Sequence, residues 1–282
     1  MARVAYQGTA GAYSHLACTQ VFPDWEYLAC DDFLSALDLV SGGFAERAMI
    51  PLENSTAGRV EEIYRLIPRT QLCVIAEHFE PVNHCLLALP GVSVEELKTV
   101  RSHPQALAQC HQRLLSMGLK AEAAVDTAMS ARDLITRGDR SNAAIASSLA
   151  AELYGLDILQ EQFQDVSGNT TRFLVFAREP EHSEYQSGIR YITSLLFSVR
   201  NMPAALYKAL GGFATNGVNM AKLESYMDGG TMEASHFHLD IYGHPEQAHV
   251  RNALEELSYF ASEVRILGSY PAHGYRKTTE FV

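Results

Sequence analysis

Polar residues are concentrated in five short segments, namely residues 8–14, 51–58, 102–105, 169–173 and 224–226. The first four adjoin apolar stretches that are typical of strands and helices. Open α/β sheets bind their ligands where strands end and helices begin. We therefore treat the first four segments as candidates for one binding site and the fifth as a separate question.

The residue types in these segments suit hydrogen-bond donation. Segment 8–14 lies between a predicted strand and a predicted helix, so its N–H groups and the helix dipole suit a carboxylate, although a tight structural turn explains it equally well. Asn54 and Ser55 fit a binding loop or a helix cap. His103 fits a site or a structural role, and Ser102 fits a site or a helix cap. The threonines of the fourth segment are also common in strands for packing reasons alone.

Patterns for nucleotide, metal or nucleophile chemistry are weak. Residues 8–14 do not match G-x-G-x-x-G, and no Walker lysine follows them. His236 and His238 share one face of a predicted strand, but the sequence offers no third ligand, so we expect no metal site. There is no G-x-S-x-G elbow, and the five cysteines include no C-x-x-C pair. These residues favour a site without a cofactor, built from neutral donors.

The charge and apolar pattern exclude two classes of partner. The 282-residue chain carries a formal net charge of −11 and has no Lys/Arg cluster, which disfavours nucleic acid. Its first six residues lack the apolar core of a signal peptide, and no apolar run approaches the roughly 20 residues that span a bilayer. The odd, scattered cysteines are typical of reduced thiols. We therefore expect a cytoplasmic protein without a membrane partner.

Short strands alternate with helices up to about residue 177, which indicates an α/β architecture with largely parallel sheets. One helix is expected to begin near residue 15, with Ser14 as its N-cap. Residues 105–117 carry apolar side chains at three- and four-residue intervals. That spacing predicts a single amphipathic helix.

The pattern changes after residues 179–187 (EPEHSEYQS), which lack apolar periodicity and are the best linker candidate. Beyond them the order of predicted elements is βαββαβ, the ferredoxin-like plan. The predicted strands and helices cover residues 191–199, 203–216, 219–226, 236–242, 245–259 and 263–267.

Five blocks of the sequence resemble the signature blocks of prephenate dehydratase, and they occur in the same order: YQGTAGAYSHLA, PLENSTAG, SHPQALAQC, AAIASSLAAELYGLDIL and NTTRFLV. The resemblance runs from about residue 4 to 177, and residues 190–270 resemble the ACT domain that follows in these enzymes. It implies a catalytic domain of two α/β lobes, similar to periplasmic binding proteins. We place the catalytic domain at 1–178 (lobes 1–76 plus 161–178, and 77–160), a linker at 179–189, an ACT domain at 190–271 and a tail at 272–282.

The resemblance also implies the reaction, in which prephenate loses CO2 and water and becomes phenylpyruvate. Forming an aromatic ring makes this strongly downhill, so no cofactor is expected. Thr171, in the T-R-F motif, is expected to donate a hydrogen bond to the leaving hydroxyl, and Glu53 to orient its neighbours. Arg172 is expected to hold a carboxylate, or to serve structurally from the back of its strand. The expected substrate-binding residues are Asn54, Ser55, Ser102, His103, Gln105, Thr170 and Arg172.

The ACT resemblance implies regulation by phenylalanine, bound where two such domains pair in a homodimer or homotetramer. The expected effector-binding residues are Ala204, Ala205, Leu206, Glu224 and Ser225. Two departures from the family pattern affect this site. Ala204 stands where glycine is frequent, and Tyr226 and Met227 replace an Arg-Pro pair.

Two alternative functions remain open at this point. An arogenate dehydratase would act on the transaminated analogue through the same steps. A catalytically inactive small-molecule sensor would use the same fold.

Overall fold

The computed structural model describes residues 1–181, 184–227 and 236–278. They form two compact units, each assembled from segments that are separated in the sequence. The first unit contains Met1–Leu39, Ala48–Arg59 and Phe79–Phe173. The second contains Val40–Arg47, Val60–His78 and the described residues of Leu174–Val282. Within the described ranges, none of the helices is both long enough and apolar enough to cross a lipid bilayer.

The first sheet has six strands in the order β2-β1-β3-β11-β5, with β4 paired to β3. Strands β1 and β2 are parallel, whereas β3 and β4 form an antiparallel hairpin. The strands are β1 (Arg3–Gln7), β2 (Glu26–Cys30), β3 (Arg47–Asn54), β4 (Gly58–Arg59), β5 (Cys73–Pro81) and β11 (Thr170–Ala177). The helices in the same part of the chain are α1 (Tyr13–Val21), α2 (Phe33–Ser41) and α3 (Glu61–Leu66).

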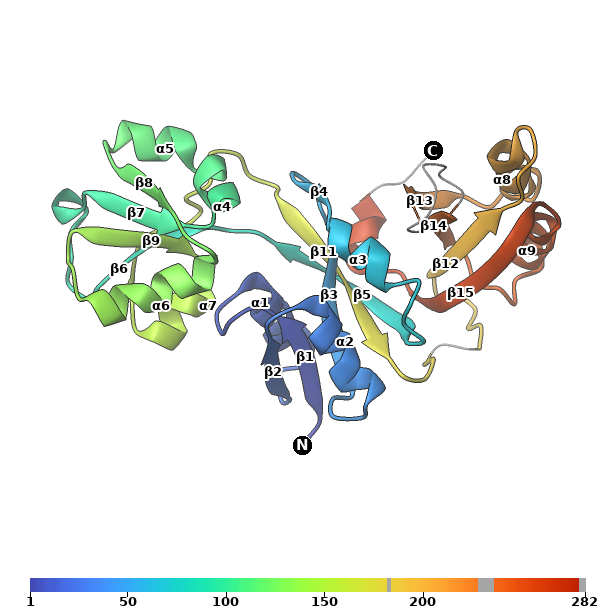
Figure 1. Cartoon of the computed structure of the whole chain (residues 1–282), viewed down its shortest axis with the longest axis horizontal. Coiled ribbons are helices and arrows are strands. Elements are labelled where there is room, and N and C mark those ends of the chain that lie inside the picture. The colour runs from blue at the N-terminus through green and yellow to red at the C-terminus, as the bar shows by residue number, and fades with distance from the viewer. Residues whose placement is uncertain (182–183, 228–235, 279–282) are drawn as a thin grey trace. The chain divides into compact units, whose positions relative to one another are not determined.

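The second sheet has five strands in the order β10-β6-β9-β7-β8, and helices cover both of its faces (Figure 1). Successive side chains of a strand point to opposite faces of a sheet, so both faces of this sheet can carry apolar residues that pack against helices. Leu86 and Ile145 belong to a core cluster with residues of α4 and α5, whereas Leu87 and Ala144 cluster with residues of α6 and α7. The strands are β6 (Cys85–Ala88), β7 (Thr99–Ser102), β8 (Lys120–Ala123), β9 (Asn142–Ala146) and β10 (Asp157–Gln160). The helices are α4 (Pro104–Gln109), α5 (His111–Ser116), α6 (Thr127–Arg137) and α7 (Ser148–Tyr154), with a 3-10 turn at Val94–Glu96.

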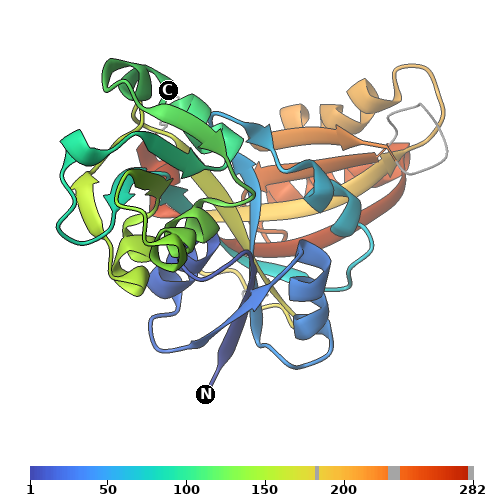
Figure 2. The same ribbon diagram turned by 60° about the vertical axis from the view of Figure 1, so that its left-hand side comes forward.

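The C-terminal part forms an antiparallel four-stranded sheet in the order β13-β14-β12-β15 (Figure 2). Its element order, βαββαβ, confirms the ferredoxin-like prediction. One face packs against both helices, through a core that includes Phe197, Phe213 and Leu257. The elements are β12 (Tyr191–Val199), α8 (Ala205–Thr215), β13 (Met220–Tyr226), β14 (His236–Tyr242), α9 (Ala248–Phe260) and β15 (Ala261–Pro271), followed by a 3-10 turn at Gly274–Thr278.

The second unit also contains α3 and most of β5, and both contact strands of the C-terminal sheet. Arg265 on β15 donates hydrogen bonds to the carbonyl oxygens of Ile67 (2.9 Å) and Pro68 (3.2 Å), just after α3. A Cβ atom added at Gly268, also on β15, would lie 1.9 Å from the carbonyl oxygen of Val74 on β5. Residues 60–78 therefore belong to the same packed unit as the C-terminal sheet, although they lie far from it in the sequence.

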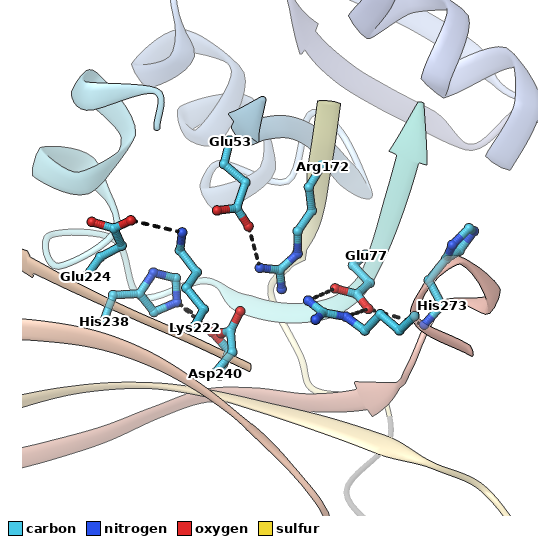
Figure 3. Close-up of polar contacts among 10 residues, drawn as sticks. Glu53, Glu77, Arg172, Lys222, Glu224, His238, Asp240 and His273 are labelled. Atoms are coloured by element: carbon cyan, nitrogen blue, oxygen red, sulfur yellow. Dashed lines mark hydrogen bonds and ion pairs between the residues drawn. The ribbon is translucent and has the colours of Figure 1, made fainter. Parts of the chain in front are cut away.

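Polar side chains are buried on this sheet. His238 Nε2 lies 3.4 Å from Asp240 Oδ1 (Figure 3). The same nitrogen is 2.7 Å from Ser194 Oγ, and all three residues are fully buried. The ring of Tyr64 on α3 lies 5.9 Å from the His238 ring and 5.7 Å from Lys222 Nζ. These contacts with buried polar groups help to define a single packing arrangement of α3 in this unit.

Three local predictions are wrong. Helix α1 begins at Tyr13 with Ala12 in the N-cap position, because a turn in which Ala12 N–H bonds to Thr9 O ends there, before Ser14. The helix expected over 105–117 is two helices that meet at Cys110. The second sheet is mixed rather than largely parallel, since β6 pairs antiparallel with both β9 and β10.

The helix break at Cys110 has a specific cause in another segment. The Asp165 carboxylate accepts the N–H groups of Gln112 (2.9 Å) and Arg113 (3.1 Å), while Asp165 N–H donates to the Gln109 carbonyl (2.7 Å). A carboxylate at a helix N-terminus satisfies donors that would otherwise have no partner. Asp165 therefore starts a new helix, and the apolar spacing of the sequence could not reveal it.

Candidate active site

Two of the predicted segments, 51–58 and 169–173, meet where β3 ends and β11 begins. Ser55 N–H donates to the Thr170 carbonyl (2.9 Å), and Thr170 N–H donates to Ser55 Oγ (3.0 Å). The Ser55 hydroxyl in turn donates to the Gly168 carbonyl (3.4 Å). Ser55 and Thr170 thus use backbone and side-chain groups to fix the loop against the strand.

Asn54 connects the loop to Thr171 through its side chain. Its Oδ1 accepts the N–H groups of Thr56 (3.0 Å) and Ala57 (2.9 Å), which closes an Asx-type turn. Because both acceptor interactions are with the turn, the amide orientation is fixed, and Nδ2 donates to Thr171 Oγ1 at 3.0 Å. The hydroxyl hydrogen of Thr171 finds no protein acceptor within the described ranges. Thr171 is therefore held as a hydrogen-bond donor whose hydrogen is available to another molecule.

Arg172 forms an ion pair with Glu53 at 3.0 Å (Figure 3). The arginine is 2% exposed, so its charge is held inside the protein. Consecutive strand residues point to opposite faces of a sheet. The guanidinium of Arg172 therefore leaves β11 on the side opposite to the Thr171 hydroxyl, which favours the structural role among the two that the sequence left open.

The side chains of Ser102 and His103 in the third segment, at the junction of β7 and α4, make hydrogen bonds within the protein. Ser102 is fully buried, and its hydroxyl donates to the Ile145 carbonyl at 2.6 Å. His103, not Ser102, occupies the N-cap position of α4, where its Nδ1 accepts Gln105 N–H at 3.2 Å. Within the described residues, no hydrogen bond joins Ser102, His103 or Gln105 to the Asn54–Thr171 pair.

Gln109, at the C-terminal end of α4, is a candidate that the sequence patterns did not identify. Its Oε1 accepts hydrogen bonds from Asn169 Nδ2 (3.0 Å) and from His84 Nε2 (2.8 Å). Asn169 directly precedes Thr170 and is 9% exposed. In the described part of the chain, Gln109 Nε2 donates to no protein acceptor. The position of Gln109 one turn after the predicted Gln105 was the signal available in the sequence, because residues four apart share a helix face.

Burial controls the titration of the groups around this site. It lowers the pKa of His84 below the ordinary value of 6.5, and only the hydrogen bond with Gln109 acts in the opposite direction. Burial also raises the pKa of the Cys85 thiol to about 11 and that of the Cys110 thiol to about 12. Both thiols stay protonated at neutral pH and are poor nucleophiles. These three side chains can therefore take part in hydrogen bonds but bring no charge to the site at neutral pH.

The expected effector segment begins at a strained position. Ala204 precedes α8 with φ 57° and ψ 32°, the left-handed region that favours glycine. Glu224 on β13 forms a 3.5 Å ion pair with Lys222. Ala205 is buried, whereas Ser225 is exposed. The structure describes Tyr226 and Met227, but the turn that follows them lies outside the described residues.

Comparison with known proteins gives a consistent result. The family model described as prephenate dehydratase matches residues 4–181. A bifunctional N-acyl-homoserine lactone acylase/prephenate dehydratase of Komagataeibacter europaeus is 45% identical over 274 residues, which is 97% of this chain and 97% of that protein. Arogenate dehydratase/prephenate dehydratase 1, a chloroplastic protein of Arabidopsis thaliana, is 39% identical over 283 residues, covering 95% of this chain and 72% of the relative.

Two solved structures are similar along nearly the whole chain. One, described as GqqA, a novel type of quorum quenching acylase, has a TM-score of 0.91 and 45% identity, covering 97% of this chain and 99% of that one. The other is a prephenate dehydratase from Arthrobacter aurescens in complex with L-Phe, with a TM-score of 0.87 and 30% identity, covering 96% of this chain and 90% of that one. The expected fold class, a double-lobed α/β part followed by a ferredoxin-like βαββαβ part, is confirmed.

Proposed function

Because this chain belongs to the prephenate dehydratase family, we propose that it converts prephenate to phenylpyruvate, with Thr171 as the donor to the departing hydroxyl. The observation that carries the proposal is the hydrogen bond from Asn54 Nδ2 to Thr171 Oγ1, at 3.0 Å. Since Asn54 occupies an acceptor site of the Thr171 oxygen, the Thr171 hydrogen is directed elsewhere. A donor fixed in this way needs no reorganisation when negative charge develops on a leaving oxygen.

The chemistry requires little else from the protein. Loss of the ring carboxylate as CO2 supplies the electron pair that expels the ring hydroxyl, and aromaticity makes the step downhill. A proton must reach the leaving oxygen, so that water departs instead of hydroxide. A threonine hydroxyl is too weak an acid to give up its proton alone, so Thr171 acts as an oriented hydrogen-bond donor. Solvent supplies the net proton that the overall reaction consumes.

The remaining substrate contacts are assigned by the groups that are available to donate. The Gln109 carboxamide presents its N–H groups, and His103 and Gln105 are exposed at the start of α4. Ser55, Thr170 and Ser102 use their side chains or backbone groups within the protein, so their proposed role is to shape the site. The Glu53–Arg172 pair supports β3 and β11 from the other face.

The C-terminal βαββαβ part is proposed to be an ACT regulatory domain that binds phenylalanine and joins chains in a dimer or tetramer, in a cytoplasmic enzyme. The support is the family membership and the relative from Arthrobacter aurescens that was solved with L-Phe. Ala204 is the main obstacle to this proposal, because a side chain at a left-handed position restricts how closely a ligand can approach the backbone. Calorimetry with phenylalanine, and inhibition curves at millimolar concentrations, test the proposal. Absence of both heat and inhibition would remove phenylalanine as the effector.

Arogenate is the second candidate substrate, because curated relatives at 39–40% identity are named as dehydratases of both arogenate and prephenate. The deciding experiment is turnover of both substrates by the purified chain under identical conditions, with phenylpyruvate and phenylalanine measured as products. The proposal expects a higher kcat/KM on prephenate. A higher kcat/KM on arogenate would replace it, and turnover of neither substrate would refute the dehydratase assignment.

The acylase activity in the name of the Komagataeibacter relative calls for a parallel assay, since the two chains match end to end. Ser194, His238 and Asp240 are the residue types of a hydrolytic triad, but they are fully buried. The serine and the aspartate also approach the same ring nitrogen, whereas a triad needs them on opposite nitrogens. Hydrolysis of an N-acyl-homoserine lactone by this chain would therefore have to use other residues.

A further inference from the structure

Four side chains from four separate segments form a continuous hydrogen-bonded row inside the first unit. Tyr13 Oη lies 2.8 Å from His84 Nδ1, and His84 Nε2 lies 2.8 Å from Gln109 Oε1, which also accepts Asn169 Nδ2 at 3.0 Å. Tyr13 is the first residue of α1, and His84 precedes β6. The row therefore joins the end of the first predicted cluster to the end of α4 and to the residue before Thr170.

The Gln109 carboxamide oxygen determines which ring nitrogen of His84 carries the hydrogen. A carboxamide oxygen can only accept, so His84 must donate to Gln109 from Nε2. In the neutral ring Nδ1 is then an acceptor, and it faces the hydroxyl of Tyr13. That hydroxyl has a single hydrogen, which it shares between His84 Nδ1 and the Asn83 carbonyl oxygen, 2.9 Å away. The tautomer of His84 is thus fixed by Gln109, and the plane of its ring is fixed by Tyr13, whose ring meets it edge-on at 5.6 Å.

The backbone around His84 is held independently of this row. His84 N–H donates to Gln164 Oε1 (2.9 Å), and the His84 carbonyl accepts Phe163 N–H (2.6 Å). Val82 N–H donates to the Asn169 carbonyl (2.8 Å). Because these bonds do not involve the imidazole, the side chain is free to have a task beyond supporting the fold.

We propose that His84 and Tyr13 are positioning residues for Gln109, a role that rests on the proposed dehydratase function. By donating to Gln109 Oε1, His84 and Asn169 saturate the carboxamide oxygen and prevent the amide from reversing. The two N–H groups of Gln109 then remain as donors for a carboxylate of the substrate. Tyr13 acts one step further away, because it stops the imidazole from rotating off Gln109.

Two near-isosteric variants test the hydrogen bonds of the two His84 ring nitrogens one at a time. In His84→Gln the amide nitrogen takes the place of Nε2 and keeps the bond to Gln109, whereas in His84→Asn the shorter side chain reaches only the Tyr13 side. Losing an oriented hydrogen bond to a charged group raises KM by about tenfold or more. We expect His84→Asn to raise KM for prephenate about tenfold with kcat within about threefold of wild type, and His84→Gln to stay within about threefold in both.

Thermodynamic coupling to Gln109 provides the decisive comparison. Gln109→Ala should raise KM at least as much as His84→Asn, and the double variant should be no worse than Gln109→Ala alone, because both remove one function. Additive losses, or equal KM values for His84→Asn and His84→Gln, would overturn the proposal. If His84→Asn does not fold, the same cycle with Tyr13→Phe decides, again by non-additivity with Gln109→Ala.

A structural control and a spectroscopic measurement complete the test. Gln164→Ala removes the support of the His84 backbone but not the imidazole contacts, so it should lower the melting temperature and leave KM unchanged. Nitrogen-15 NMR of the wild-type protein should show the hydrogen of the neutral His84 imidazole on Nε2 at neutral pH. A hydrogen on Nδ1 instead would refute the proposed donation from His84 to Gln109. The NMR result does not depend on turnover. A chain that fails to convert prephenate therefore refutes the proposed function separately from the positioning role.

Discussion

Asn54→Asp reverses a single hydrogen bond while keeping the shape of the side chain. The oxygen that corresponds to Oδ1 still accepts the N–H groups of Thr56 and Ala57, so the turn should persist. The atom that faces Thr171 Oγ1 changes from a donor to an acceptor. An aspartate has an ordinary pKa of about 3.9 and is ionised at neutral pH, so the Thr171 hydroxyl will donate to the new carboxylate and no longer to the substrate.

The size of the effect follows from the loss of one preorganised donor. Removing such a donor typically lowers kcat by about 10²–10³, or about 2.7–4 kcal/mol of transition-state stabilisation. Folding stability should change by less than about 1 kcal/mol, since both turn hydrogen bonds remain. Asn54→Ala makes a useful contrast, because it also removes two turn hydrogen bonds and should cost about 1–3 kcal/mol of unfolding free energy.

Steady-state turnover of prephenate and urea denaturation measure the two quantities. The added negative charge also raises KM for a dianionic substrate, so kcat is the parameter to compare. Thr171→Val removes the hydroxyl without adding charge. If the reasoning holds, Asn54→Asp combined with Thr171→Val lowers kcat no further than Thr171→Val alone. A kcat for Asn54→Asp within about threefold of wild type would refute the role of this hydrogen bond.

Four further predictions test other contacts. Thr171→Ala should lower kcat by at least about 10² while Thr171→Ser keeps most of it, and near-normal turnover in the alanine variant would remove Thr171 from the mechanism. Glu53→Gln should lower the unfolding free energy more than Arg172→Met does, by about 3–5 against about 1–2 kcal/mol in urea titrations. Losing the Glu53 carboxylate leaves the buried Arg172 charge less compensated, whereas Arg172→Met leaves a carboxylate that is partly solvated; equal losses would contradict this. Burial depresses the pKa of His84 in the folded state, so the contribution of the neutral imidazole to stability is present above the unfolded pKa near 6.5 and is lost as the pH falls below that value. The melting temperature of His84→Gln should therefore decline less between about pH 7 and 5.5 than that of the wild type. Parallel declines of the two melting temperatures would contradict this prediction. Gly268→Ala should destabilise the protein by at least about 1–3 kcal/mol, because its Cβ would overlap the Val74 backbone, whereas Gly274→Ala, in open space, should be neutral in the same thermal scan.

The fold class was predictable because its signals are local and repeated. Alternating strands and helices indicated the α/β part, and the βαββαβ order indicated the ferredoxin-like part. The break at Cys110 was not predictable, because the carboxylate that causes it belongs to Asp165, more than 50 residues along the chain. Short strands with exposed residues, such as β8 and β10, give weak periodicity and went unpredicted.

The candidate site was predictable in its segments but not in its geometry. Residue types identified the Asn54 loop and the Thr171 strand, and the structure joins them by a direct hydrogen bond. The same patterns could not show that the Ser102 hydroxyl donates its hydrogen bond to the Ile145 carbonyl. They also could not show that the amide of Gln109, rather than that of Gln105, is oriented by hydrogen bonds to neighbouring side chains. Hydrogen-bond partners depend on neighbours that are distant in sequence, and a single sequence gives little information about them.

The absence of space between Gly268 and the Val74 backbone limits how this protein can recombine with its relatives. A crossover near residue 179 would take β15 from one parent and β5 from the other, although these strands are fitted to each other within one packed unit. The carbonyl groups of Ile67 and Pro68 would likewise meet a foreign side chain in place of Arg265. A chimaera that exchanges the C-terminal βαββαβ part should therefore take residues 60–78 together with residues 190–271 from the same parent. The exchangeable unit is defined by packing and is discontinuous in the sequence.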